Sequence, residues 1–158
     1  MFFFVSLTTI IMASWDILIT IACAFAISKA MVNSGVADAV ARFIIGMSHH
    51  YGPHVLLAAV FIITNLFTEL ITNNAAAALA FPLALSISSQ MGVSPMPFFV
   101  VICMAASASF STPIGYQTNL IVQGIGNYKF TDFVRIGLPL NIITFLISIF
   151  LIPLIWPF

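Results

Sequence analysis

Charged residues are scarce in this 158-residue sequence, because Asp, Glu, Lys and Arg together make up only 5% of it. Soluble domains carry about 25% charged residues, so a water-soluble globular protein is excluded. The four basic residues are balanced by four acidic ones. This balance excludes the basic surface that nucleic-acid binding needs, and no nucleic-acid partner is expected.

Cysteine is also scarce, and histidine is confined to one place. Cys23 and Cys103 each lie inside an apolar run, where a free cysteine behaves as a small buried hydrophobe, so no disulfide is predicted. His49, His50 and His54 fall on a polar loop with Gly and Pro, which is typical of an interfacial loop and not of a metal site. No Ser-His-Asp or Cys-His arrangement is expected at membrane depth, which argues against an enzyme.

Apolar residues are what the sequence has in excess. Hydrophobic residues make up 62% of the chain, and the mean hydropathy is +1.20. Long runs of this character predict an all-α integral membrane protein with several crossings, in a cell membrane or a bacterial inner membrane. The lipid bilayer is therefore the first expected partner.

The sequence predicts a single transmembrane domain over residues 1–158. Its first part, 2–32, is predicted to hold two scaffold spans divided at Ser14-Trp15-Asp16, where an interfacial Trp lies beside a candidate N-cap. The first span lacks a basic leader region, so it is not interpreted as a signal peptide. Apolar residues at helical spacing predict an interfacial amphipathic helix over 36–48. The remaining elements are a re-entrant hairpin (55–90), a broken helix (94–127) and a last span (132–156).

Two polar interruptions inside long apolar stretches are the most informative feature. The first reads Thr-Glu-Leu-Ile-Thr-Asn-Asn over 68–74, and the second reads Ser-Thr-Pro-Ile-Gly-Tyr-Gln-Thr-Asn over 111–119. Polar, helix-breaking segments are costly at membrane depth unless they line a cavity. A pair of them therefore predicts a binding site.

The two interruptions predict different local structures. The apolar arms of the first, 55–71 and 75–89, are short for full crossings, which favours a hairpin with its tip near the midplane over two crossings joined by a loop. At the second, Pro113 lacks an N–H group and Gly115 tolerates unusual dihedrals. The helix is expected to unwind there and to resume near Leu120.

Such breaks expose groups that bind a small cation. Thr68, Asn73 and Asn119 offer neutral side-chain oxygens, and main-chain carbonyls are freed near Ile71 and Gly115. Oxygen ligands of this kind suit a hard cation such as sodium.

The same breaks favour an anion beside that cation. Helices that begin at Ala75 and Leu120 would direct unpaired N–H groups and positive dipole ends toward one point. Asn74, Thr118 and Asn119 add neutral donors. Because no Lys or Arg is near, co-bound cations would supply the positive charge that a divalent anion needs, and this would couple the two solutes.

Other interpretations of these residues stay open. A single Asn, Thr or Ser in a membrane helix often serves only as a hydrogen-bonding contact between helices, although the clustering on two breaks favours a site. Glu69 is the one acid deep in an apolar run. It could be a proton or cation site, or it could accept structural hydrogen bonds.

At these residues the chain resembles the divalent-anion/sodium symporter family, of the solute carrier family 13 type within the ion transporter superfamily. Residues 68–74 resemble its Ser-Asn-Thr hairpin signature, 112–119 its second signature, and 130–140 the lead-in to its final helix. The likeness covers nearly the whole chain but only the family's C-terminal repeat. It implies half of an inverted-repeat transporter, with the N-terminal half missing, an elevator-like motion and a homodimer.

The resemblance also implies site residues. By motif position, sodium would bind Thr68, Ile71, Asn73 and Gly115, and substrate would contact Asn73, Asn74, Tyr116, Thr118 and Asn119, with Glu69, Thr72, Thr112 and Pro113 beside them. Asn74 stands where the signature has Thr, and Tyr116-Gln117-Thr118 stand where dicarboxylate carriers tend to have Thr-Pro-Pro. These departures resemble the branch that includes sulfate carriers.

The predicted function is sodium-coupled transport of a small divalent anion, with sulfate favoured and a dicarboxylate possible. Two alternatives remain. One is a cation/proton antiporter of the same superfamily, in which Glu69 carries the proton. The other is a membrane subunit that packs helices and transports nothing.

Overall fold

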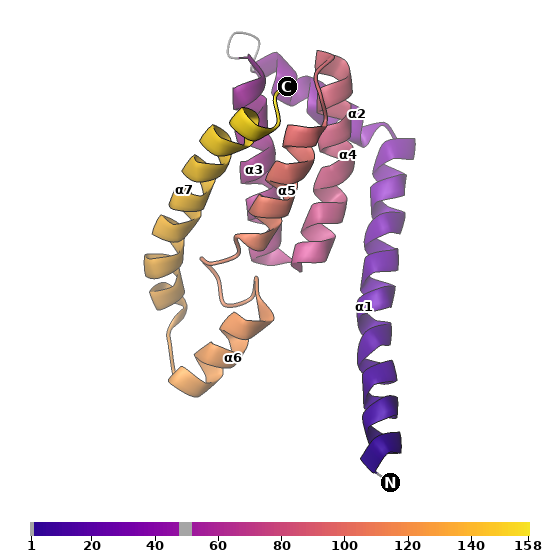
Figure 1. Cartoon of the computed structure of the whole chain (residues 1–158), viewed down its shortest axis with the longest axis vertical. Helices are drawn as coiled ribbons and strands as arrows, with labels where there is room; N and C mark the ends of the chain where they lie inside the picture. The colour runs from indigo at the N-terminus through magenta and orange to yellow at the C-terminus, as the bar shows by residue number, and fades with distance from the viewer. Residues whose placement is uncertain (1, 48–51) are drawn as a thin grey trace.

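The computed structural model describes residues 2–47 and 52–158, and within these ranges the chain is helical with no β-strand. The helices are α1 (Phe2–Asn33), α2 (Val36–Met47), α3 (Gly52–Leu70), α4 (Asn73–Met91), α5 (Met96–Ser107), α6 (Gln117–Gly126) and α7 (Phe130–Ile155), as Figure 1 shows. The predicted all-α class is confirmed. Of the predicted polar loop, His49 and His50 lie outside the described residues, whereas His54 lies in the first turn of α3.

α1 is one continuous helix, so the prediction of two spans within 2–32 is wrong. Ser14-Trp15-Asp16 was expected to separate the two spans. These three residues fill less than one helical turn, and the main-chain hydrogen bonds of the apolar residues on both sides continue through them. The chain does break where Gly35 takes a φ of +72°, between α1 and α2.

Two described helices, α3 with 19 residues and α7 with 26, are long and apolar enough to cross a membrane. Leu18–Asn33 and Val36–Gly46, bent by 69°, would be a third crossing if the pair forms one span. α3 begins at Gly52, before the start expected at 55, because Pro53 is well suited to a first helical turn. This arm is thus a full-length helix and not a short one, and re-entry of the hairpin stays a prediction.

The core lies between α3, α4 and α5, with α7 packed along it. Ala80, Ala84 and Ala105 are fully buried there, and small residues of this kind let helix backbones approach closely. Figure 1 shows the turn between α3 and α4 at the same end of the bundle as the C-terminal end of α5. The core therefore holds the two polar interruptions close together.

Both interruptions break their helices, but at slightly different residues from those expected. Only Ile71 and Thr72 separate α3 from α4, so Asn73 and Asn74 lie in the first turn of α4. The second break, which we call the 108–116 break, follows α5 and ends where α6 begins at Gln117, three residues before the predicted resumption. α7 starts before residue 132, because the Asp132 carboxylate accepts the N–H of Lys129 at 2.9 Å and caps the helix from its first turn.

Candidate functional site

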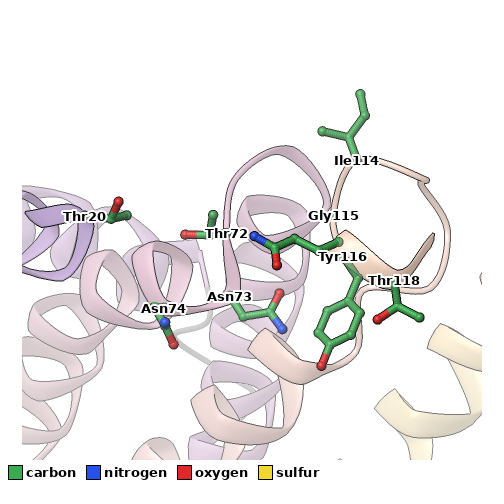
Figure 2. Close-up of a pocket in the computed structure, with 9 residues that line it drawn as sticks. Thr20, Thr72, Asn73, Asn74, Ile114, Gly115, Tyr116 and Thr118 are labelled. Atoms are coloured by element: carbon green, nitrogen blue, oxygen red, sulfur yellow. The ribbon is translucent and has the colours of Figure 1, made fainter. Parts of the chain in front are cut away.

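The two breaks face each other across a cavity of about 470 Å³. Its lining residues come from three places in the chain, namely α1, the start of α4 and the 108–116 break with the start of α6: Thr20, Thr72, Asn73, Asn74, Ile114, Gly115, Tyr116, Gln117 and Thr118. Figure 2 shows the Asn73 side chain facing Tyr116, with Ile114 extending away from the other labelled side chains. We call this cavity the central pocket.

Two helix N-termini border the central pocket. α4 follows Thr72, whose Oγ1 accepts the N–H of Ala75 at 3.4 Å, and α6 follows Tyr116, whose side chain makes no capping hydrogen bond. The first turns of both helices carry N–H groups without partners inside the helix. These donors and the positive ends of two helix dipoles favour an anion at this point.

A cluster of oxygens lies deeper, between the tip of the hairpin and the break. One polar atom of the Asn73 carboxamide lies 2.8 Å from Thr68 Oγ1, 3.2 Å from Ala106 O and 3.3 Å from Gly115 O. Thr68 is fully buried, and its hydroxyl also lies 2.7 Å from Ala106 O. The structure thus brings together three of the four predicted sodium ligands and adds the carbonyl of Ala106. We call these groups the oxygen cluster.

The Asn73 amide can serve this cluster in two ways. With its nitrogen toward the break, it donates to Thr68 Oγ1, Ala106 O and Gly115 O. With its oxygen there, it accepts from the Thr68 hydroxyl and completes a group of four oxygens that share a single hydroxyl proton. The second arrangement is the donor set that a hard cation prefers.

The fourth predicted sodium ligand, Ile71, lies in the turn between α3 and α4. Its N–H donates to Phe67 O at 2.9 Å, and its carbonyl oxygen accepts no hydrogen bond from the described residues. The carbonyl is therefore available to an ion, as expected for a residue between two helices.

Two hydrogen bonds tie the hairpin tip to the break, and a third holds the break itself. Ser109 Oγ donates to Thr68 O at 3.0 Å and Thr112 Oγ1 donates to Glu69 O at 2.8 Å, while within the break Gly115 N donates to Thr112 Oγ1 at 3.1 Å. Pro113 is buried between them. These bonds satisfy main-chain groups that the breaks would otherwise leave unpaired, and they fix the geometry of the oxygen cluster.

Thr112→Val should destabilise the protein by about 1–3 kcal/mol, because the carbonyl of Glu69 and the N–H of Gly115 both lose a partly buried partner. Chemical unfolding of the purified protein measures the change. Thr144→Val is the matched control, since the Thr144 hydroxyl bonds only to Leu140 O within its own helix. Equal stability of the two variants would contradict a bracing role for Thr112.

Asn119 lies elsewhere than predicted. Its amide nitrogen donates to Ser109 O and Thr112 O, each at 3.1 Å, and the residue lines a different cavity with Tyr128 and Gly137. Because α6 begins at Gln117, Asn119 falls on the helix face that turns back to the break. It braces the loop and does not face the central pocket.

Glu69 lies outside the central pocket and is 9% exposed. Its Oε1 accepts the N–H of Ser111 at 2.9 Å and Nδ2 of Asn141 at 2.8 Å. The carboxylate therefore joins α3, the break and α7, which agrees with the structural alternative for this residue.

Sequence reasoning missed several of these groups. Ala106 contributes a main-chain carbonyl, which no side-chain pattern reveals, and Ser109 lies just before the polar run that begins at Ser111. Thr20 lies on α1, far away in the sequence. Only Asn141 gave a signal, as a lone amide inside the apolar last span.

Several known proteins to which this chain is similar are named as transporters or cotransporters. A family model described as a citrate transporter matches residues 1–157. The chain is 40% identical over 142 residues to an uncharacterized transporter of Synechocystis sp., covering 90% of this chain and 23% of that protein. It is 37% identical over 139 residues to sodium/sulfate cotransporter 1 of Chlamydomonas reinhardtii (87% and 16%). Against the sodium-dependent dicarboxylate transporter of Staphylococcus saprophyticus it is 25% identical over 146 residues (90% and 27%). The chain thus spans about a quarter or less of the length of these curated relatives.

Proposed function

Because this chain belongs to the citrate transporter family, we propose that it forms part of a sodium-coupled carrier for a small divalent anion, with sulfate favoured over a dicarboxylate. The family assignment confirms the predicted place among divalent-anion/sodium symporters. The segment would be one of two related halves, and the other half would lie in the remaining three quarters of a protein as long as its relatives.

The oxygen cluster is the observation that carries this proposal. Sodium would bind among Thr68 Oγ1, Asn73 Oδ1, the carbonyls of Ala106 and Gly115, and the free carbonyl of Ile71. These are neutral oxygens at two helix breaks and in the helix turns beside them, held in place by the bonds from Ser109 and Thr112. Such a site removes the hydration shell of the ion without a formal negative charge of its own, so it leaves the ion's charge available to a neighbouring anion.

The anion would bind in the central pocket, and the sodium would lie deeper, in the oxygen cluster. Among the described residues no Lys, Arg or His lines this pocket, and therefore donors at the two helix N-termini and the side chains of Asn74 and Thr118 would hold the anion. Two negative charges need more than neutral donors in a medium of low dielectric constant. Bound sodium supplies the missing charge, which makes each solute's affinity depend on the other.

Asn73 provides a direct link between the two solutes. With its nitrogen toward the break, the amide donates to Thr68 Oγ1 and to the carbonyls of Ala106 and Gly115, and this arrangement would be the one without sodium. With sodium, the oxygen turns to the ion and the nitrogen becomes free to donate to the anion. Sodium would therefore bind first, because the anion gains this donor only afterwards.

Sulfate is favoured for two reasons. Relatives named as sodium/sulfate cotransporters share 37% to 39% identity with the chain, whereas a relative named as a dicarboxylate transporter shares 25%. Sulfate is also an acceptor on every side, and Asn74, Gln117 and Thr118 present side-chain donors around the pocket.

Uptake of radiolabelled sulfate and succinate tests the function. The complete transporter that contains this segment is reconstituted into liposomes, with sodium or choline outside. Sodium-dependent sulfate uptake that exceeds succinate uptake supports the proposal. Sodium uptake that is driven by a proton gradient, with neither anion present, would favour the antiporter, and no uptake of either anion or of sodium would favour a subunit that does not transport.

Asn73→Ala should weaken the apparent sodium affinity of sulfate uptake by about tenfold or more, comparable to the loss of a supporting residue at a metal site. The affinity for sulfate should fall in parallel, because the same amide serves both solutes. Sodium titrations at several sulfate concentrations measure both effects. Asn33→Ala, at the exposed end of α1, is the control, and a loss of sulfate affinity without a change in sodium affinity would contradict the dual role.

The motion that completes transport is also part of the proposal. By analogy with the family, the hairpin α3–α4 and the broken helix α5–α6 would slide against a scaffold that includes α1 and α2. The scaffold would also form the homodimer contact.

A further inference from the structure

A second cavity, of about 410 Å³, lies between α3, the 108–116 break and α7. It shares no residue with the central pocket. Four polar side chains line it, namely Asn65, Glu69, Ser111 and Asn141, and the remaining lining is apolar. We call it the Glu69 cavity.

Two buried oxygens at this cavity find no hydrogen-bond partner among the described residues, namely Oε2 of Glu69 and Oδ1 of Asn141. The other oxygen of Glu69 is held by Ser111 N and Asn141 Nδ2, at 2.9 and 2.8 Å. The carboxylate is thus fixed in place, 9% exposed, with one oxygen left over. Buried polar atoms in native proteins are nearly always satisfied, so a pair of unsatisfied acceptors indicates an absent donor or cation.

Within the part of the chain that the structure describes, the charge of Glu69 also lacks a partner. Of the residues that line the cavity, Glu69 is the sole titratable one. On the elements packed around it, Asp132 and Arg135 lie near the start of α7, His54 lies at the far end of α3, and Tyr116 lies at the central pocket. A carboxylate at membrane depth is costly unless it is paired.

We propose that the Glu69 cavity is a second sodium-binding site. Its ligands would be Oε2 of Glu69 and Oδ1 of Asn141, with Oδ1 of Asn65 and Oγ of Ser111. Asn65 Oδ1 is available because its contact with Asn141 Nδ2 is long, at 3.5 Å, while Ser111 Oγ accepts from the same nitrogen at 2.8 Å. Carboxylate, amide and hydroxyl oxygens are the ligands of a hard cation, and the cavity has room for water to complete the shell.

This second site would be coupled to the first. The main-chain oxygen of Glu69 accepts from Thr112 Oγ1, which in turn accepts from Gly115 N. Sodium that holds the Glu69 side chain would therefore steady the break that carries the Gly115 carbonyl. This inference rests on the proposed function, because the ion bound in the Glu69 cavity would be a further coupling ion of the same carrier.

Sodium binding without any anion tests the proposal. The melting temperature of the purified complete transporter is followed as sodium replaces choline at constant ionic strength, for the wild type, Asn73→Ala, Glu69→Gln and the double variant. Glu69→Gln keeps the shape of the side chain, and its amide can donate to the unpartnered Asn141 oxygen. A ligand that binds only the folded state stabilises that state by RT ln(1 + L/Kd), where L is the free ligand concentration, so the melting temperature rises with the sodium concentration and the dependence reports the sodium affinity.

We expect each single variant to keep part of the sodium-dependent shift and the double variant to lose it. In the Asn73→Ala background, Glu69→Gln should weaken the remaining sodium affinity at least about tenfold. Loss of a residue that only supports a metal ligand already costs about that much in metal affinity. An unchanged sodium response on adding Glu69→Gln would overturn the proposal. If Glu69→Gln does not fold, Asn141→Leu replaces it with the same two outcomes, and Thr144→Val on α7 is the control. This experiment measures sodium binding and not transport. Its outcome therefore does not depend on whether the transporter takes up sulfate.

Discussion

Gly115→Ala is expected to abolish sodium-dependent uptake. A Cβ atom at this position would lie 1.8 Å from Ser109 Oγ and 2.8 Å from Thr68 O, both far inside van der Waals contact. Relief requires the break to move away from the hairpin tip, which pulls the Gly115 carbonyl out of the oxygen cluster. A misplacement of about 1 Å at a site can cost on the order of a hundredfold in rate, and transport assays in liposomes measure the loss.

A second substitution, at Ser109, separates the steric clash of Gly115→Ala from any other effect of that substitution. Ser109→Gly removes the atoms at 1.8 Å and 3.2 Å but leaves the main-chain oxygen of Thr68 at 2.8 Å. The double variant should therefore recover part, but not all, of the sodium-dependent uptake. Gly46→Ala in α2 is the control, because nothing lies within 4 Å of its added Cβ. Full activity of Gly115→Ala alone would show that the break does not need this close approach.

The position of the two breaks could be predicted because their cause is local. Polar residues at 72–74 interrupt apolar runs, and Pro113 together with Gly115 in a polar stretch disfavours a regular helix, whereas the isolated prolines Pro82 and Pro139 in apolar runs stay inside α4 and α7. The exact ends could not be predicted, since they depend on which donors find partners. Thr72 caps α4 through Ala75 N, and α4 therefore starts two residues earlier than its alanines suggested.

The site was predictable in its side chains and not in its main-chain partners. Thr68, Asn73 and Gly115 belong to motifs, and the structure brings them to one point. The Ala106 carbonyl joins them only because α5 ends beside the hairpin tip, which is a consequence of tertiary packing. Asn119 belongs to the same motif but turns back to Ser109 O and Thr112 O, because main-chain acceptors of the loop compete for its amide.

The unbroken course of α1 has a similar explanation. Ser14 and Asp16 are favoured at helix caps, but capping preference is worth only about 1 kcal/mol. The apolar residues on both sides form helical hydrogen bonds cooperatively, and stopping the helix would leave main-chain groups unpaired in an apolar environment. A weak local signal therefore loses to the surrounding helix.

Gly137→Ala should destabilise the protein by at least about 1–3 kcal/mol, which is the usual cost of overpacking a buried position. Helix propensity acts in the opposite direction, because alanine is better than glycine in a helix by about 1 kcal/mol. The steric term wins because the added Cβ would lie 2.0 Å from Phe110 O and 2.7 Å from Ser111 Cα, which are main-chain atoms that cannot rotate away. α7 must then move from the break and carry Asn141 away from Glu69. Chemical unfolding measures the loss, and Gly124→Ala within α6, where nothing lies within 4 Å of the new Cβ, should instead be neutral or stabilising. Equal gains in stability for both variants would refute the close packing of α7 on the break.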